Sequence, residues 1–179
     1  IISRLIRNNE IIRVKKGLYV FGKDSLGPAY SKEILANMIY GPSYISLEYA
    51  LSYYGLIPER VDTVTSITNK KNKFYKTPIG DFSYRYLSNK VFMHGVDRVS
   101  ISDDRTVLMA SKEKAIIDLL YQQKNLYDWV EIKSFLFENM RIDFDVFSAL
   151  SAEKFMSLGT RYSHKAVLCF IHYIKTLLP

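Results

Sequence analysis

Hydrophobic and polar positions at the start of the chain predict a helix followed by a β-hairpin. Residues 1–7 place four apolar side chains at helical spacing, with Arg4 and Arg7 on the opposite face. Residues 10–22 contain two short apolar runs around a Lys-Lys-Gly turn at 15–17, and this arrangement is typical of a hairpin. A helix followed directly by a basic-tipped hairpin resembles the closing half of a winged helix-turn-helix. The alternative is an ordinary helix and hairpin packed on the main domain.

The rest of the pattern predicts helices, then strands, then helices again. Turn-forming glycine, proline, asparagine and aspartate residues separate the runs. After a joint at Gly27-Pro28, helices are expected at 32–39 and 47–55, strands at 61–68, 73–77, 81–88, 91–95, 98–102 and 106–110, and helices at 112–123, 129–140, 145–158 and 164–178. This order predicts an α+β fold with a curved, mainly antiparallel sheet. We expect a partial winged helix-turn-helix module at 1–27 and a second domain at 28–179.

Capping residues and apolar spacing give further detail on the helices expected at 32–39, 47–55 and 112–123. Ser31, Ser46 and Ser111 each precede a predicted helix and are expected to cap it. One stripe of the helix at 47–55 is expected to face inward, and its members are Leu47, Ala50, Leu51 and Tyr54.

Composition restricts the setting of the protein. The 179 residues are 48% hydrophobic and 24% charged, which suits a globular core that needs no disulfide or metal. The single cysteine, Cys169, excludes an internal disulfide and favours a reducing cytoplasm. No apolar run approaches the roughly 20 residues that cross a bilayer. Because the chain begins at Ile1 inside a predicted helix, we expect the module to be truncated at its N-terminus.

The net charge of +7 is concentrated in two stretches. Residues 1–30 carry six Lys or Arg against two acids, and residues 60–90 carry seven against two. Basic clusters of this kind favour a polyanionic partner, although a solvated face is the plain alternative. In the first stretch, the predicted DNA-binding residues are Arg4, Arg7, Arg13, Lys15 and Lys16.

The second stretch interleaves cations with aromatic rings. A possible partner or nucleic-acid surface comprises Lys70, Lys71, Lys73, Tyr75, Lys76 and Arg85. The alternative, which we favour, is an edge strand that lysines protect against aggregation. The 14 tyrosines also suggest an exposed aromatic patch formed by some of Tyr44, Tyr49, Tyr53, Tyr75, Tyr84 and Tyr86, rimmed by Lys70, Lys71, Lys73 and Arg85.

No arrangement of residues in 31–179 predicts a catalytic site or a bound cofactor. Cys169 and His172 share a helical face, but no second pair of metal ligands lies nearby in sequence. Asp143 and Asp145 resemble a metal-binding carboxylate pair, yet the preceding stretch lacks the Gly-Ser turn of nucleotidyltransferases, so a turn and a helix cap are expected.

The remaining enzyme alternative is a metal-dependent nuclease or other nucleic-acid-processing enzyme. Asp103 or Asp104 would hold the metal, and Glu113 with Lys112 or Lys114 would complete the site. The adjacent acid and lysine follow a capping serine, where an acid suits the helix dipole. The start of a helix therefore accounts for this acid and lysine without a catalytic role.

Several blocks of the sequence together resemble the AbiEi family of antitoxins from abortive-infection toxin–antitoxin systems. The basic hairpin that ends in Gly-Leu-Tyr at 17–19 resembles the family's wing, and YISLEYALSYYGLIPE at 44–59 is similar to its most recognisable block. VDTVTSITNKK at 61–71 and SKEKAIIDLLY at 111–121 resemble the strand and the helix that follow. The first helices of the family's winged helix-turn-helix are absent from the sequence.

The resemblance implies a bacterial regulator active in phage defence. It would bind operator DNA through the N-terminal module, repress its own operon and counter a nucleotidyltransferase toxin. The matching blocks also have a purely structural explanation, in which Ala50 and Gly55 permit close packing and Glu113 and Asp118 pair with each other or cap. The expected protein is therefore a non-catalytic antitoxin and transcriptional autoregulator.

Overall fold

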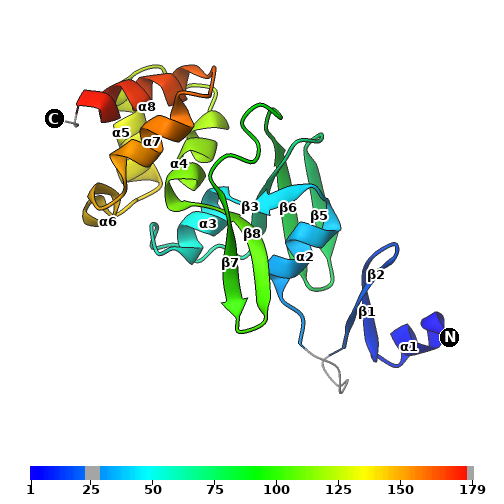
Figure 1. Cartoon of the computed structure of the whole chain (residues 1–179). Coiled ribbons are helices and arrows are strands. Elements are labelled where there is room, and N and C mark those ends of the chain that lie inside the picture. Colours follow the sequence, from blue (N-terminus) through cyan, green and yellow to red (C-terminus); the bar gives the residue numbers. More distant parts are fainter. Residues whose placement is uncertain (23–28, 177–179) are drawn as a thin grey trace.

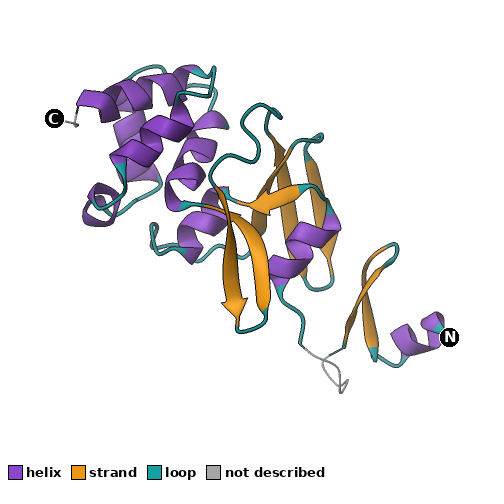
Figure 2. Cartoon of the chain, viewed as in Figure 1, coloured by secondary structure: helices purple, strands orange, loops and turns teal. Residues whose placement is uncertain are grey.

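The computed structural model describes residues 1–22 and 29–176, and these residues form an α+β fold with two sheets. Figure 1 shows a small N-terminal helix and hairpin, a central mixed layer and a group of C-terminal helices. Figure 2 shows a strand hairpin near the N-terminus, the remaining strands in the middle of the chain and the C-terminal helices beyond them. The joint expected at residues 27 and 28, and the last residues of the final helix, lie outside the described residues.

The N-terminal elements follow the predicted order. They are α1 (Ile2–Arg7), β1 (Ile11–Lys15) and β2 (Leu18–Phe21), and the two strands form an antiparallel hairpin. Gly17 in the turn has a φ of +79°, a conformation that glycine adopts without the steric penalty of a side chain. The helix and the hairpin are therefore present, although they do not by themselves make a winged helix.

The central elements build a six-stranded mixed sheet. They are α2 (Lys32–Ile39), β3 (Ser43–Ile45), α3 (Leu47–Tyr53), β4 (Val64–Thr68), β5 (Lys73–Thr77), β6 (Gly80–Tyr86), β7 (Val96–Ser102) and β8 (Arg105–Ala110). The strand order is β5-β6-β4-β3-β8-β7, with three antiparallel and two parallel pairings. Strand β3, which the sequence pattern did not predict, lies in the middle. The strand predicted at 91–95 is wrong, because these residues form turns.

The C-terminal elements are helical, as expected. They are α4 (Lys112–Tyr121), α5 (Trp129–Ser134), a π-helical turn η1 (Phe135–Asn139), α6 (Phe144–Ser148), α7 (Ala152–Gly159) and α8 (Lys165–Thr176). The segment predicted as one helix at 145–158 is divided in two. Asp143 and Ser151 cap the two shorter helices through their side chains.

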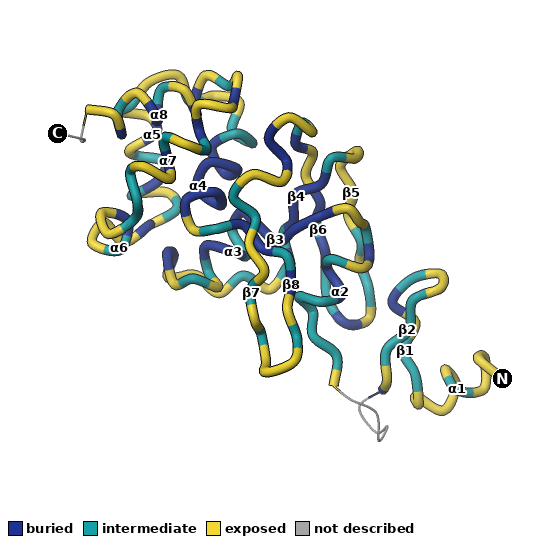
Figure 3. Tube along the Cα trace, in the orientation of Figure 1, coloured by how far each residue is buried: buried dark blue, intermediate teal, exposed yellow. Residues whose placement is uncertain are grey.

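Helices cover both faces of the sheet. Alternation along the strands places Tyr44 and Tyr84 on opposite faces, because Tyr44 pairs with Ile67 and Tyr84 pairs with Ser66. Helix α2 covers the Tyr84 face, and the Tyr84 hydroxyl donates to the Ala36 carbonyl at 2.7 Å. Helices α3 and α4 pack on the other face, and Figure 3 shows the buried residues concentrated between these layers.

The predicted inward stripe of α3 is largely confirmed. Leu47, Ala50 and Leu51 are buried, and Tyr54 is half-buried with its hydroxyl bonded to the Ala110 carbonyl at 2.9 Å. Gly55 does not provide close packing, since a Cβ there would meet nothing within 4 Å. Its φ of +68° indicates that it ends the helix instead.

Two of the three serine caps form as predicted. Ser31 and Ser111 each accept a hydrogen bond from a backbone amide of the following helix at 3.2 Å. The cap predicted at Ser46 is wrong, because its hydroxyl makes no bond to α3. It donates to the Asp118 carboxylate at 2.9 Å instead.

Candidate nucleic-acid interface

The N-terminal helix presents both apolar and basic side chains to solvent. Helix α1 packs against β1 and contains no buried residue. Ile2 remains 51% exposed, and Arg4 and Arg7 are exposed at the end of the helix. Leu5 is the one half-buried residue of α1 (Ile2–Arg7), and the hairpin strand β1 is the main packing partner of the helix among the described residues.

The hairpin has one face toward the core and one face toward solvent. Val14 is buried in the core cluster, and Ile12 and Val20 pack against it. Arg13 alternates with these residues and is therefore exposed on the other face, beside its cross-strand partner Tyr19. The side of the hairpin that carries Arg13 is thus accessible to a ligand.

The two lysines at the turn have different surroundings. The Lys15 ammonium donates to the Ile39 carbonyl at the C-terminal end of α2, where a cation is favourable. Lys16 is exposed at the tip of the hairpin. Of the five predicted DNA-binding residues, Arg4, Arg7, Arg13 and Lys16 are thus exposed, whereas Lys15 attaches the hairpin to the main body.

The second basic stretch does not form a single surface. Lys70 donates to the Gly41 carbonyl at 2.6 Å and lies 5.6 Å from the centroid of the Tyr40 ring. Lys73 pairs with Tyr84 across β5 and β6, so Arg85, the next residue on β6, points to the opposite face. The predicted set is therefore divided between two faces of the sheet.

Strand β5 lies at the edge of the sheet, as the protective interpretation of its lysines requires. Lys71, Lys73 and Lys76 are exposed along or just before this edge. Tyr75 is half-buried, and its ring packs 5.9 Å from that of Tyr84. Protection of the sheet edge against aggregation thus accounts for Lys71, Lys73 and Lys76.

Two of the six tyrosines predicted for an exposed patch cannot belong to it. Tyr44 and Tyr84 are completely or almost completely buried, on opposite faces of the sheet. Tyr53 and Tyr86 are 43% and 47% exposed, but they belong to α3 and to the end of β6. Tyr49 and Tyr75 are half-buried, so four of the six predicted tyrosines keep some exposed surface, whereas the two fully buried ones fill the core.

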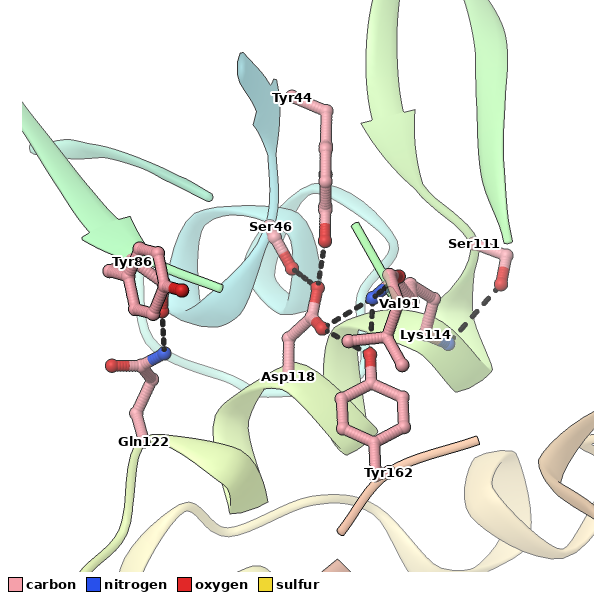
Figure 4. A network of polar contacts seen from close by, with 9 residues as sticks. All are labelled: Tyr44, Ser46, Tyr86, Val91, Ser111, Lys114, Asp118, Gln122 and Tyr162. Carbon is pink, nitrogen blue, oxygen red and sulfur yellow. Dashed lines mark hydrogen bonds and ion pairs between the residues drawn. The ribbon is translucent and has the colours of Figure 1, made fainter. Parts of the chain in front are cut away.

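A buried polar network joins the sheet to the C-terminal helices (Figure 4). The Asp118 carboxylate on α4 accepts hydrogen bonds from the hydroxyls of Tyr44, Ser46 and Tyr162, each at 2.9 Å. The Lys114 ammonium lies 2.7 Å from the same carboxylate and also donates to the Tyr162 hydroxyl. The Lys114 and Asp118 side chains have no exposed surface. The pair expected between Glu113 and Asp118 is therefore replaced by one between Lys114 and Asp118.

Burial dominates the electrostatics of this network. It lowers the pKa of Lys114, and the Asp118 charge only partly opposes that effect. Burial and the nearby Asp118 carboxylate raise the pKa of Tyr44 and of Tyr162 well above the ordinary value of 10.0. Both hydroxyls are thus kept as neutral donors. All members of the network are buried, so their hydrogen bonds hold β3 and α4 against the connection between α7 and α8.

The nuclease arrangement is not assembled. Asp103 and Asp104 are exposed in the turn before β8, whereas Glu113 and Lys114 follow the other end of that strand. Six residues of strand separate the two ends by roughly 20 Å. Glu113 accepts from the Ser151 amide at 3.3 Å, and Lys114 belongs to the buried network.

No metal site emerges from the histidines and acids. In the part of the chain that the structure describes, no three His, Cys, Asp or Glu side chains lie close enough to hold an ion together. Cys169 is half-buried and His172 is exposed. Asp143 accepts from the amides of Asp145 and Val146 at 2.9 and 3.0 Å, which confirms the expected helix cap.

A polar groove lies on the α3–α4 face of the sheet, and of the residues predicted for a nucleic-acid surface only Arg85 lines it. Its volume is about 590 Å³, and strands β4, β5 and β6 form its floor. The residues that line it are Leu47, Glu48, Val61, Thr63, Thr65, Asn72, Phe74, Ser83, Arg85, Leu119, Gln122, Gln123 and Lys124. The cations, the aromatic ring and the amides come from separate elements, so no contiguous motif marks the groove.

The described residues define an α+β protein with a basic helix–hairpin module and a mixed sheet. No protein-family model matches the chain, and comparison with curated proteins found no match. In residues 1–22 and 29–176, no helix has both the length and the apolar character needed to cross a membrane.

Proposed function

We propose that the protein is a DNA-binding regulator whose helix–hairpin module contacts duplex phosphates. The observation that carries this proposal is the display of four exposed cations, Arg4, Arg7, Arg13 and Lys16, on one small module. Phosphate neutralisation by such side chains supplies the sequence-independent part of DNA affinity. The hairpin would act as the wing beside the backbone, with α1 next to it.

The antitoxin role is the second part of the proposal. It rests on the resemblance of residues 44–59 and 111–121 to the AbiEi family, and through it the protein would counter a nucleotidyltransferase toxin. Co-expression with the nucleotidyltransferase toxin that it is proposed to counter should restore growth of a host that the toxin arrests. Continued growth arrest with well-folded protein present would contradict the antitoxin role while leaving the DNA proposal open.

The different surroundings of the two turn lysines provide the test of DNA binding. Lys16→Ala removes an exposed cation, so it should weaken binding to every duplex and reduce the salt slope by about 0.9 per lost phosphate contact. Lys15→Ala is the matched control, because its ammonium already bonds to Ile39. Titration of a labelled duplex at several salt concentrations measures both slopes. An unchanged slope for Lys16→Ala, or equal effects of the two variants, would refute the proposed wing contact.

A further inference from the structure

The groove on the α3–α4 face has the features of a ligand site separate from the N-terminal module. Helices α3 and α4 cover the centre of the sheet but leave the half formed by β5 and β6 open. Figure 3 shows the exposed residues along β5 and the loop that precedes it. The groove volume of about 590 Å³ lies within the range of small-ligand sites and of subsites for larger ligands.

An exposed aromatic ring stands on the floor of this groove. Phe74 is 57% exposed, and it pairs across the strands with Ser83. Because Ser83 and Arg85 alternate with the buried Phe82 and Tyr84, they share the open face with Phe74. A largely exposed phenyl ring on an open sheet offers a flat surface on which a base can stack.

Two cations border the ring. Arg85 is exposed on β6, and Lys124 is exposed just after α4. Neither side chain makes a hydrogen bond or ion pair to another described residue. Glu48 is the one carboxylate among the lining residues, and it can accept from the exocyclic amino group of a base.

Amide side chains supply further donors and acceptors. The Asn72 Oδ1 atom accepts from the Tyr86 amide at 2.7 Å, and the Gln122 side chain donates to the Tyr86 carbonyl at 3.1 Å. These bonds fix both side chains against the backbone. The Asn72 Nδ2 and Gln122 Oε1 atoms have no hydrogen bond within the described residues, and both amides line the groove.

We propose that this groove binds single-stranded nucleic acid. One base stacks on Phe74, Arg85 and Lys124 contact the flanking phosphates, and the Asn72 and Gln122 amides contact base edges. A double helix does not suit the site, because its bases are stacked on one another and their faces are inaccessible to Phe74. The site is independent of the proposed wing.

Oligonucleotide binding tests the proposal. Labelled oligo-U and oligo-dT of about 8 nucleotides, within the range that one OB fold covers, should bind the full chain in fluorescence anisotropy. Phe74→Leu keeps an apolar side chain but removes the ring, and it should weaken this binding by about 5- to 150-fold. Arg85→Ala should lower the salt slope by about 0.7 for one lost phosphate contact.

A neighbouring residue provides the control. Lys73→Ala removes the same unit of charge from the adjacent strand but on the opposite face, so it should leave single-strand binding nearly unchanged. Lys16→Ala should likewise leave it unchanged while affecting duplex binding. Absence of oligonucleotide binding, or equal losses in Lys73→Ala and Arg85→Ala, would each overturn the proposal.

Discussion

Asp118 is the common hydrogen-bond partner in the buried polar network. Its carboxylate has one charged and three neutral partners, drawn from β3, from Ser46 directly after that strand, from α4 and from the α7–α8 connection. Spacing in the sequence allowed a Lys114–Asp118 pair, since residues four apart meet on a helix. Spacing could not reveal that the Ser46 hydroxyl would bond to Asp118 instead of capping α3. Leu47, with a φ of +59°, turns the chain at this point.

Removal of the Asp118 charge should destabilise the fold strongly. Asp118→Leu leaves the Lys114 ammonium buried without a counter-ion, and such a change costs about 3–5 kcal/mol of unfolding free energy. The double variant Lys114→Met/Asp118→Leu removes both charges and should recover a substantial part of that loss. Urea denaturation of the two variants measures the difference. If the double variant is as unstable as the single one, the unpaired charge is not the source of the loss.

At the scale of elements, long periodic segments were predictable and short or tightly turned ones were not. Helix α4 and strand β5 match the expected segments because their patterns persist over several residues. Strand β3 has only three residues, too few to display a period, yet it pairs with both β4 and β8. Val91 and Phe92 imitate a strand in sequence, but they reach the core from a turn.

A charged residue introduced into α3 should destabilise the fold strongly only on the face of the helix that points into the core. Ala50 is completely buried, so Ala50→Asp places an unpaired carboxylate in the core and should cost at least about 3 kcal/mol of stability. Tyr53→Asp on the same helix is the control, because Tyr53 is 43% exposed, and its cost should stay within about 1 kcal/mol. Thermal unfolding followed by circular dichroism compares the two. Similar losses from both variants would contradict the assigned orientation of α3.

At the scale of the whole molecule, adjacency in sequence determined which candidate sites could be predicted. The residues of the N-terminal module lie within one short segment, so their charge pattern was visible without a structure. The groove combines Phe74 and Arg85 with Lys124, residues that only the sheet register and the packing of α4 bring together. The same topology separates Lys73 from Arg85, which the sequence pattern had grouped.

Helices α7 and α8 pack against α4, which in turn packs on the sheet. The buried network therefore connects the sheet with these last two helices. Figure 1 shows α7 and α8 on the side of α4 away from the sheet. Tyr162, between these two helices, brings its hydroxyl to both Lys114 and Asp118. A hydroxyl in this position links the packing of α8 to that of β3 through a single carboxylate.

Loss of that hydroxyl should loosen the C-terminal helices before it loosens the sheet. Tyr162→Phe keeps the ring but removes one partner from each member of the buried pair, at a cost of about 1–3 kcal/mol. Because Tyr44 of β3 and Ser46 directly after it keep their bonds to Asp118, the loss should fall mainly on α7 and α8. Hydrogen exchange followed by mass spectrometry should show faster exchange in 152–176, with β4 and β6 protected nearly as before. Tyr121→Phe changes a neighbouring ring that lies outside the network's hydrogen bonds, and it should leave both regions unchanged. Equal acceleration in the sheet and the C-terminal helices of Tyr162→Phe would mean that the molecule opens as one unit, and the coupling assigned to Tyr162 would be wrong.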